Sequence, residues 1–100
     1  MTATDDIPGQ IFDSVWDALE DTPAEAANMR LRSELMIAIR EAVAGWGVTQ
    51  AAAARRLEVT QPRLNDLLRG RINNFSVDAL VLLAARAGLA VRVQIEHAAA

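Results

Sequence analysis

The sequence contains no cysteine, no lysine and no tyrosine, and its one histidine, His97, lies among terminal alanines. Without cysteine there is no disulfide framework and no thiolate metal site, which favours an intracellular, cytoplasmic protein. A lone histidine cannot build a metal cage. No glycine-rich phosphate loop and no carboxylate pair beside a suitable acid or base is found. We therefore expect a protein that is not an enzyme and that binds neither a metal nor a cofactor.

Long apolar runs are also absent, although hydrophobic residues make up 52% of the 100 residues. The longest run is far shorter than the about 20 residues that cross a bilayer, so we expect no membrane segment. The N-terminal residues include Asp5 and Asp6, and no basic residue precedes Arg30, so we expect no secretory signal. This length and hydrophobic content predict one small domain with an apolar core.

The net charge of −3 hides an uneven distribution of charge along the chain. Residues 1–25 hold seven acidic and no basic side chains, residues 49–71 carry a charge of +3, and residues 72–100 balance. Every basic residue is arginine, whose planar guanidinium suits bidentate contacts to phosphate and guanine. An acidic arm before a basic middle segment favours a nucleic-acid partner more than the net charge does.

Capping residues divide the middle of the chain into helices. Thr22-Pro23 and Gly47 bound a long helix, whose apolar residues recur at helical spacing: Leu31, Leu35, Ile39, Val43 and Trp46. Three shorter helices are predicted after the N-caps Thr49, Thr60 and Ser76, over 50–57, over 61–68 and up to Gly88. From Leu89 to Glu96 the apolar period changes to two, which predicts a half-buried strand.

The two short helices between Thr49 and Gly70 have the layout of a helix-turn-helix. About three residues join them, Ala54 is small where the helices touch, and Val59 fills the angle of the turn. In such a unit the first half of the second helix lies in the major groove of DNA. Glu58 stands at a turn position where a positive φ would strain a side-chain-bearing residue.

From Leu35 to Gly88 the chain resembles the XRE/Cro-like helix-turn-helix family. The resemblance lies in the Thr-Gln pairs that begin both helices, in Val59 of the turn between them and in the Leu-Leu-Arg-Gly segment that ends the second helix. Its flanks, residues 14–19 and Phe75-Ser76, resemble the antitoxin-type, HigA-like branch of that family. Members of this branch pair with small RelE-like ribonuclease toxins and repress their own operons. The resemblance implies a mainly α, lambda-repressor-like domain of four to five helices, with a C-terminal β-strand that pairs across a dimer.

The resemblance also implies positions for DNA contacts. The base-reading positions are Gln61, Pro62, Arg63, Asn65 and Asp66. The positions for the sugar–phosphate backbone are Thr49, Gln50, Thr60, Arg69, Arg71 and Asn73. Glutamine and asparagine side chains pair with adenine, and Arg63 either pairs with guanine or holds a phosphate. Proline offers only apolar contact, for example to a thymine methyl group. The anionic Asp66 either accepts from cytosine or orients an arginine.

Two further segments flank this unit. An amphipathic helix is expected in the acidic arm, with one apolar face formed by Ile11, Phe12, Val15, Trp16 and Leu19. This face either packs on its own domain or docks a small basic toxin protein, and the two are not exclusive. The C-terminal strand carries Val91, Val93 and Ile95 on one face. A lone strand leaves backbone groups unpaired, so we expect it to pair with a second copy rather than within its own chain.

The sequence thus predicts an acidic arm (1–21), a helix-turn-helix domain (22–88) and a dimerisation strand with a tail (89–100). We expect a homodimer that binds a palindromic operator in double-stranded DNA, with half-sites about 34 Å apart. The predicted function is a sequence-specific repressor, specialised as the antitoxin of a type II toxin–antitoxin pair. The alternatives are a phage-type repressor without a toxin partner and a protein-interaction scaffold that does not bind DNA.

Overall fold

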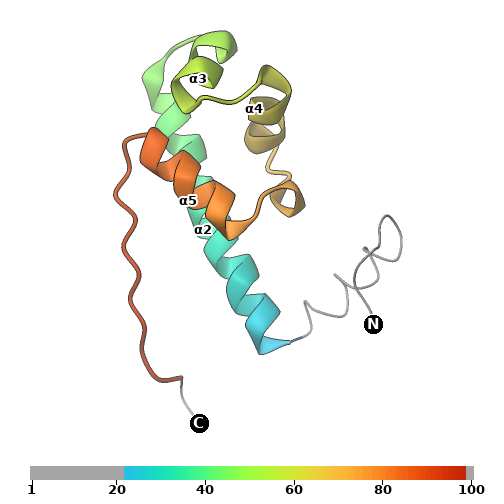
Figure 1. Cartoon of the computed structure of the whole chain (residues 1–100), viewed down its shortest axis with the longest axis vertical. Coiled ribbons are helices and arrows are strands. Elements are labelled where there is room, and N and C mark those ends of the chain that lie inside the picture. Colours follow the sequence, from blue (N-terminus) through green and yellow to red (C-terminus); the bar gives the residue numbers. More distant parts are fainter. Residues whose placement is uncertain (1–21, 99–100) are drawn as a thin grey trace, which may run out of the picture.

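The structure is a computed structural model of the chain, and it describes residues 22–98. In order, these residues form α2 (Pro23–Trp46), α3 (Gln50–Leu57), α4 (Gln61–Leu68), the single 3-10 turn η1 (Ile72–Asn74) and α5 (Val77–Arg86) (Figure 1). The expectation of a mainly α helix-turn-helix domain with helices at these positions is confirmed. The helix expected around residues 11–19 lies outside the described residues.

Each α-helix begins where the sequence places a hydroxyl side chain. The four N-caps are Thr22, Thr49, Thr60 and Ser76. Each hydroxyl oxygen accepts a hydrogen bond, 3.1–3.2 Å long, from the backbone N–H three residues further on. These bonds satisfy donors that a helix start would otherwise leave unpaired. Pro23 and Pro62 follow their caps in the first turn, where a missing N–H costs nothing.

Helices α3, α4 and α5 end in the same backbone motif. A residue one or two positions after each helix takes the left-handed conformation, and the N–H of the residue that follows it bonds back to a carbonyl five residues earlier. These closing bonds run from Val59 to Ala54, from Arg71 to Asp66 and from Leu89 to Ala84, at 2.9–3.0 Å. Glycines 70 and 88 occupy two of the left-handed positions, but Glu58 occupies the third, with φ 60°. Glu58 therefore has the positive φ that would strain this turn, and no other non-glycine residue within 22–98 has a positive φ.

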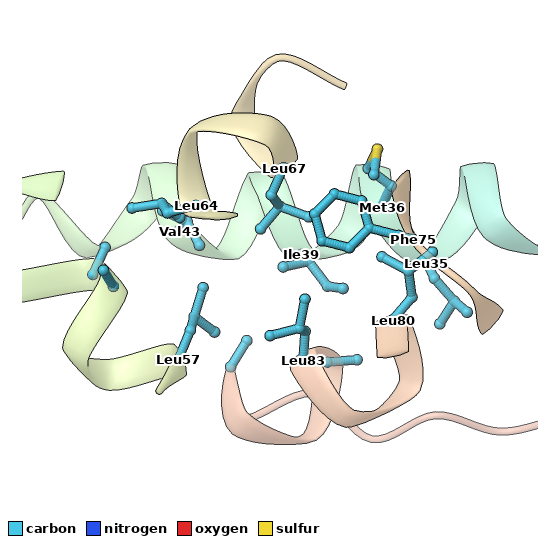
Figure 2. Close-up of a cluster of buried hydrophobic side chains, with 14 residues drawn as sticks. Leu35, Met36, Ile39, Val43, Leu57, Leu64, Leu67, Phe75, Leu80 and Leu83 are labelled. Carbon is cyan, nitrogen blue, oxygen red and sulfur yellow. The ribbon is translucent and has the colours of Figure 1, made fainter. Parts of the chain in front are cut away.

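The core lies where α2, α4 and α5 meet. Ile39 of α2 is fully buried and sits between Leu67 of α4 and Leu83 of α5 (Figure 2). The other large side chains with almost no exposed surface are Leu57, Leu64, Phe75 and Leu80. Each such side chain contributes about 1.5–3 kcal/mol by leaving water. The core therefore fixes α4 by its inner face, while the outer face of α4 is left to solvent.

Residues 89–98 leave α5 as an extended segment that runs along the side of α5 opposite α4 (Figure 1). Its first residues, with Leu31 and Ala38 of α2, line a groove of about 240 Å³. Further along, Val93 and Ile95 are 68% and 89% exposed. Among the described residues of this single chain no strand forms. A ladder needs a neighbouring strand, so the strand and its pairing across a dimer stay a prediction.

Candidate nucleic-acid interface

Helices α3 and α4 form the helix-turn-helix through small and apolar contacts. Ala53 and Ala54 of α3 are almost fully buried, so the two helix axes can approach closely. The turn residue Val59 is half-buried against the same cluster. Leu57 and Leu64, both 0% exposed, fill the space beneath the turn. The packing roles that the sequence predicts for these residues are confirmed.

The first turn of α4 is open to solvent. Gln61 and Pro62 are exposed, whereas Leu64 and Leu67 on the opposite face are buried. Asn65, one turn after Gln61, is half-buried. Gln61 makes no hydrogen bond within the described chain, so its amide is free to meet a ligand. A rigid helix thus presents an unused hydrogen-bonding side chain at the place where a helix-turn-helix reads bases.

The backbone-contact positions expected from the sequence are also on the surface. Exposed side chains occupy each of them: Thr49, Gln50, Thr60, Arg69, Arg71 and Asn73. The hydroxyls of Thr49 and Thr60 are used as N-caps, so what these positions offer to a phosphate is the start of a helix. Unpaired N–H groups and the helix dipole favour an anion there. The structure therefore provides both arginines and helix starts for a polyanion.

Asp66 does not stand alone as an anion on this surface. Its carboxylate Oδ1 lies 3.6 Å from Nη1 of Arg71, and its Oδ2 accepts a hydrogen bond of 3.4 Å from Nδ2 of Asn74. The side chain of Asp66 is 28% exposed. Its charge is thus compensated inside the chain, and it orients an arginine, one of the two roles considered from the sequence.

Arg63 is engaged within the chain as well. Its Nη1 donates a hydrogen bond of 2.8 Å to the carbonyl of Asn74. Its Cζ lies 4.0 Å from the centre of the Phe75 ring, which is a cation–π distance. Of the five predicted base-reading residues, the structure therefore leaves Gln61 and Pro62 exposed and ties Arg63 and Asp66 to the segment after α4.

Arg32 of α2 holds the segment after α4, a role that the sequence analysis does not predict. It is 2% exposed. Its Nε donates to Oδ1 of Asn28 at 2.8 Å, and its Nη1 donates to the carbonyls of Ile72 at 3.2 Å and Phe75 at 3.5 Å. The signal was available, because residue 32 lies four positions before Met36 and seven before Ile39, on the buried stripe of α2.

Two other groups of predicted residues have different outcomes. The proposed dimer residues Val91, Val93 and Ile95 are all exposed in the single chain. The proposed partner-binding stripe lies outside the described residues.

Within residues 22–98 there is no helix of sufficient length and apolarity to span a bilayer. The same part of the chain has no cluster of three or more acidic or histidine side chains suited to a metal ion.

The comparison with protein-family models agrees with this geometry. A family model described as a helix-turn-helix domain matches residues 18–96, which include all of α2 to α5. The comparison with curated proteins gives no match. Because the family model covers most of the chain, including the exposed first turn of α4 and the caps that position it, the protein belongs to this family of helix-turn-helix domains.

Proposed function

We propose that the protein is a sequence-specific DNA-binding repressor that acts by occupying its operator as a homodimer. The exposed first turn of α4 carries this proposal. Gln61 and Pro62 face solvent on a helix that Leu64 and Leu67 anchor in the core. That arrangement lets the side chains enter the major groove without a change of fold.

The side chains of α4 have distinct roles in this proposal. Gln61 reads adenine through a bidentate pair, and Asn65 reads a second base pair one helical turn further on. Pro62 makes apolar contact, for example with a thymine methyl group. Around them, Gln50, Arg69 and the helix starts at Thr49 and Thr60 hold the sugar–phosphate backbone.

The C-terminal segment supports the homodimer. Val91, Val93 and Ile95 are exposed and alternate with Arg92 and Gln94, as expected for a strand with one apolar face. Pairing of this segment with its copy around a two-fold axis would bury these side chains and satisfy backbone groups of both chains. Two α4 helices would then read the two halves of a palindrome.

An antitoxin role is the specialisation that we propose for this repressor. The acidic residues of 1–25, with no basic residue among them, would complement a small basic ribonuclease toxin of the RelE-like type. Neutralisation would work by covering the active surface of the toxin, with no chemistry on it. The resemblance of the segments at 14–19 and 75–76 to antitoxins supports the same specialisation.

The DNA-binding proposal is tested by selection from a pool of random duplexes, followed by titration of the enriched sequence over a series of salt concentrations. We expect a palindromic sequence to be enriched and the affinity to fall steeply with salt, because neutralised phosphates release counterions. A protein that enriches no sequence and shows no salt dependence would instead be a scaffold, and the proposal would be wrong.

The antitoxin proposal is tested by co-expression with the neighbouring open reading frame of the same operon. We expect a short basic protein that arrests growth alone and is neutralised by the full chain. Neutralisation should fail when residues 1–21 are deleted, while circular dichroism shows that the helices of the shortened chain remain. A neighbour without toxicity would favour the phage-type repressor, and full neutralisation by the shortened chain would reject the arm as the docking element.

A further inference from the structure

Two arginines from different helices hold the segment between α4 and α5. The turn η1 has three residues, and the backbone N–H of Phe75, directly after it, donates to the carbonyl of Ile72 at 3.2 Å. Arg32 of α2 donates to the carbonyls of Ile72 and Phe75, and Arg63 of α4 donates to the carbonyl of Asn74 between them. Two guanidinium groups from different helices therefore add to the backbone hydrogen bonds that set the course of this loop, residues 71–75.

The position of Arg63 is specific in two ways. The Cζ of its guanidinium lies over the Phe75 ring, 4.0 Å from the ring centre, and the same group donates the 2.8 Å bond to the Asn74 carbonyl. Phe75 is itself 1% exposed, so the ring cannot move to follow the arginine. Reaching a base edge would require Arg63 to give up both contacts, and that cost counts against its use as a base reader.

Asp66 provides a second tie between α4 and the same loop. It lies three residues after Arg63, so both side chains emerge from one face of the helix. Its carboxylate accepts from the Asn74 side chain and pairs with Arg71. Arg63 thus holds the backbone of the loop, while Asp66 holds two of its side chains. Within this ordered loop, Arg71 and Asn73 remain exposed.

From these contacts we infer that Arg63 is a positioning residue and not a base reader. It fixes the loop in the conformation in which Arg71 and Asn73 meet the sugar–phosphate backbone, with Asp66 as the second tie. This inference rests on the proposed DNA-binding function. Base preference then comes from Gln61, Pro62 and Asn65, whereas Arg63 contributes to affinity alone.

In this inference, Arg63 acts by ordering the loop of residues 71–75 before DNA binds. A loop that already has its bound conformation loses little conformational entropy when it meets DNA. Without the guanidinium, DNA must order the loop, and that cost is the same for every sequence. Loss of Arg63 should therefore weaken binding to all duplexes alike and leave the preferred base at each position unchanged. Loss of a base reader would instead change the base preference at one position of the operator.

The test compares the full-length chain with two variants of equal charge. Arg63→Met keeps an unbranched apolar stem over Phe75 but has no guanidinium. Arg69→Met is the control, because Arg69 is exposed, neighbours the same loop and has no contact to it that the structure records. Base preference is measured by selection from random duplexes, and loop order by amide hydrogen exchange of residues 71–75 without DNA.

We expect Arg63→Met to enrich the same sequence as the wild-type chain, with affinity lowered about tenfold for every duplex, as for the loss of one charge-assisted hydrogen bond. Exchange of the amides of 71–75 should be faster while the thermal unfolding midpoint stays close to that of wild type. Arg69→Met should also weaken all duplexes, but its loop should exchange as slowly as in the wild-type chain.

Two results would overturn the inference. If Arg63→Met loses the preference for one base pair, Arg63 reads that base pair. If its loop exchanges no faster than that of Arg69→Met, the guanidinium does not order the loop. Failure of the proposed function is a different result, because the wild-type chain itself would then enrich no sequence.

Discussion

The helix-turn-helix and the C-terminal segment of this chain differ in how much of their structure one chain supplies. In α3 and α4 every helix start is capped, every end closes on a backbone hydrogen bond, and the inner face lies in the core. Residues 89–98 have the alternating pattern of a strand, yet form no ladder within the described chain and leave Val93 and Ile95 exposed. The first region is complete in one copy, and the second is not.

The helix-turn-helix is held by contacts within one chain, whereas the C-terminal segment leaves apolar side chains exposed that a second chain could cover. Substitutions beneath the helix-turn-helix should change the folding of a single chain, whereas under the proposed homodimer substitutions of the exposed residues Val93 and Ile95 should change the association of two chains. Substitutions on the outer face of α4 should change neither of these and act on DNA binding alone. Substitutions in each of these regions test whether its effect is on folding, on association of two chains or on DNA binding.

The largest effect is expected for Arg32→Met, which removes the side-chain donor to the buried carbonyl of Phe75 and leaves the carbonyl of Ile72 with only the backbone N–H of Phe75. Such a loss should lower the free energy of unfolding by about 3 kcal/mol. Urea unfolding at fixed protein concentration measures it. Arg30→Met is the matched control, because Arg30 is exposed on the same helix. Equal stability of the two variants would contradict the anchoring role of Arg32.

The second effect concerns assembly. Val93→Asp places a charge on the apolar face of the proposed strand, so we expect monomers by light scattering and operator affinity lowered about 100-fold through loss of two-site binding. Circular dichroism should show the same helices as in the wild-type chain. Gln94→Asp, on the other face of the alternation, should leave the dimer intact. A Val93→Asp dimer would refute the paired strand.

The third effect concerns base reading. Gln61→Ala should cost about 1–3 kcal/mol at one base pair of the operator and nothing elsewhere, because one bidentate pair is lost. Competition with operators mutated at single positions measures this cost. Gln50→Ala should weaken all operators by similar factors, since its expected contact is with the backbone. A uniform loss for Gln61→Ala would show that Gln61 does not read a base.

The smallest effect is expected in the turn itself. Glu58→Gly removes left-handed strain at φ 60° and should raise the free energy of unfolding by up to about 1 kcal/mol. It also removes the 3.6 Å pair with Arg86, but Glu58 is 68% exposed, and exposed pairs contribute little. Glu58→Ala loses the same pair and keeps the strain, so it should not stabilise. Thermal melting that shows destabilisation by Glu58→Gly would argue against strain at this turn.

Most of the fold could be predicted because its determinants are local. Hydroxyl caps at Thr49, Thr60 and Ser76, each followed by apolar residues at helical spacing, place helix starts without reference to the rest of the chain. The sequence raised a positive φ at Glu58 only as a condition, and the structure shows it. Exposure of Gln61 and Pro62 followed from the burial of the leucines on the opposite face of α4.

The contacts of Arg63 and Arg32 could not be predicted from local patterns alone. Arg63 meets Asn74 and Phe75 only after the chain has turned back past α4, and Arg32 meets residues 40 or more positions away. An arginine at a surface-like position has the same sequence signature whether it meets a phosphate, a carbonyl or an aromatic ring. The helical register of Arg32 contains a signal of its burial that the sequence analysis did not use, but no signal of the carbonyl groups that it binds.

The lack of internal contacts at Gln61 has a consequence for how this protein can change over time. An exposed residue that makes no hydrogen bond within the described chain can be exchanged without loss of folding stability. Pro62, also exposed, keeps the first turn of α4 rigid while its neighbour varies. Single mutations at position 61 therefore offer evolution, or a designer's library, new target sites on an unaltered scaffold.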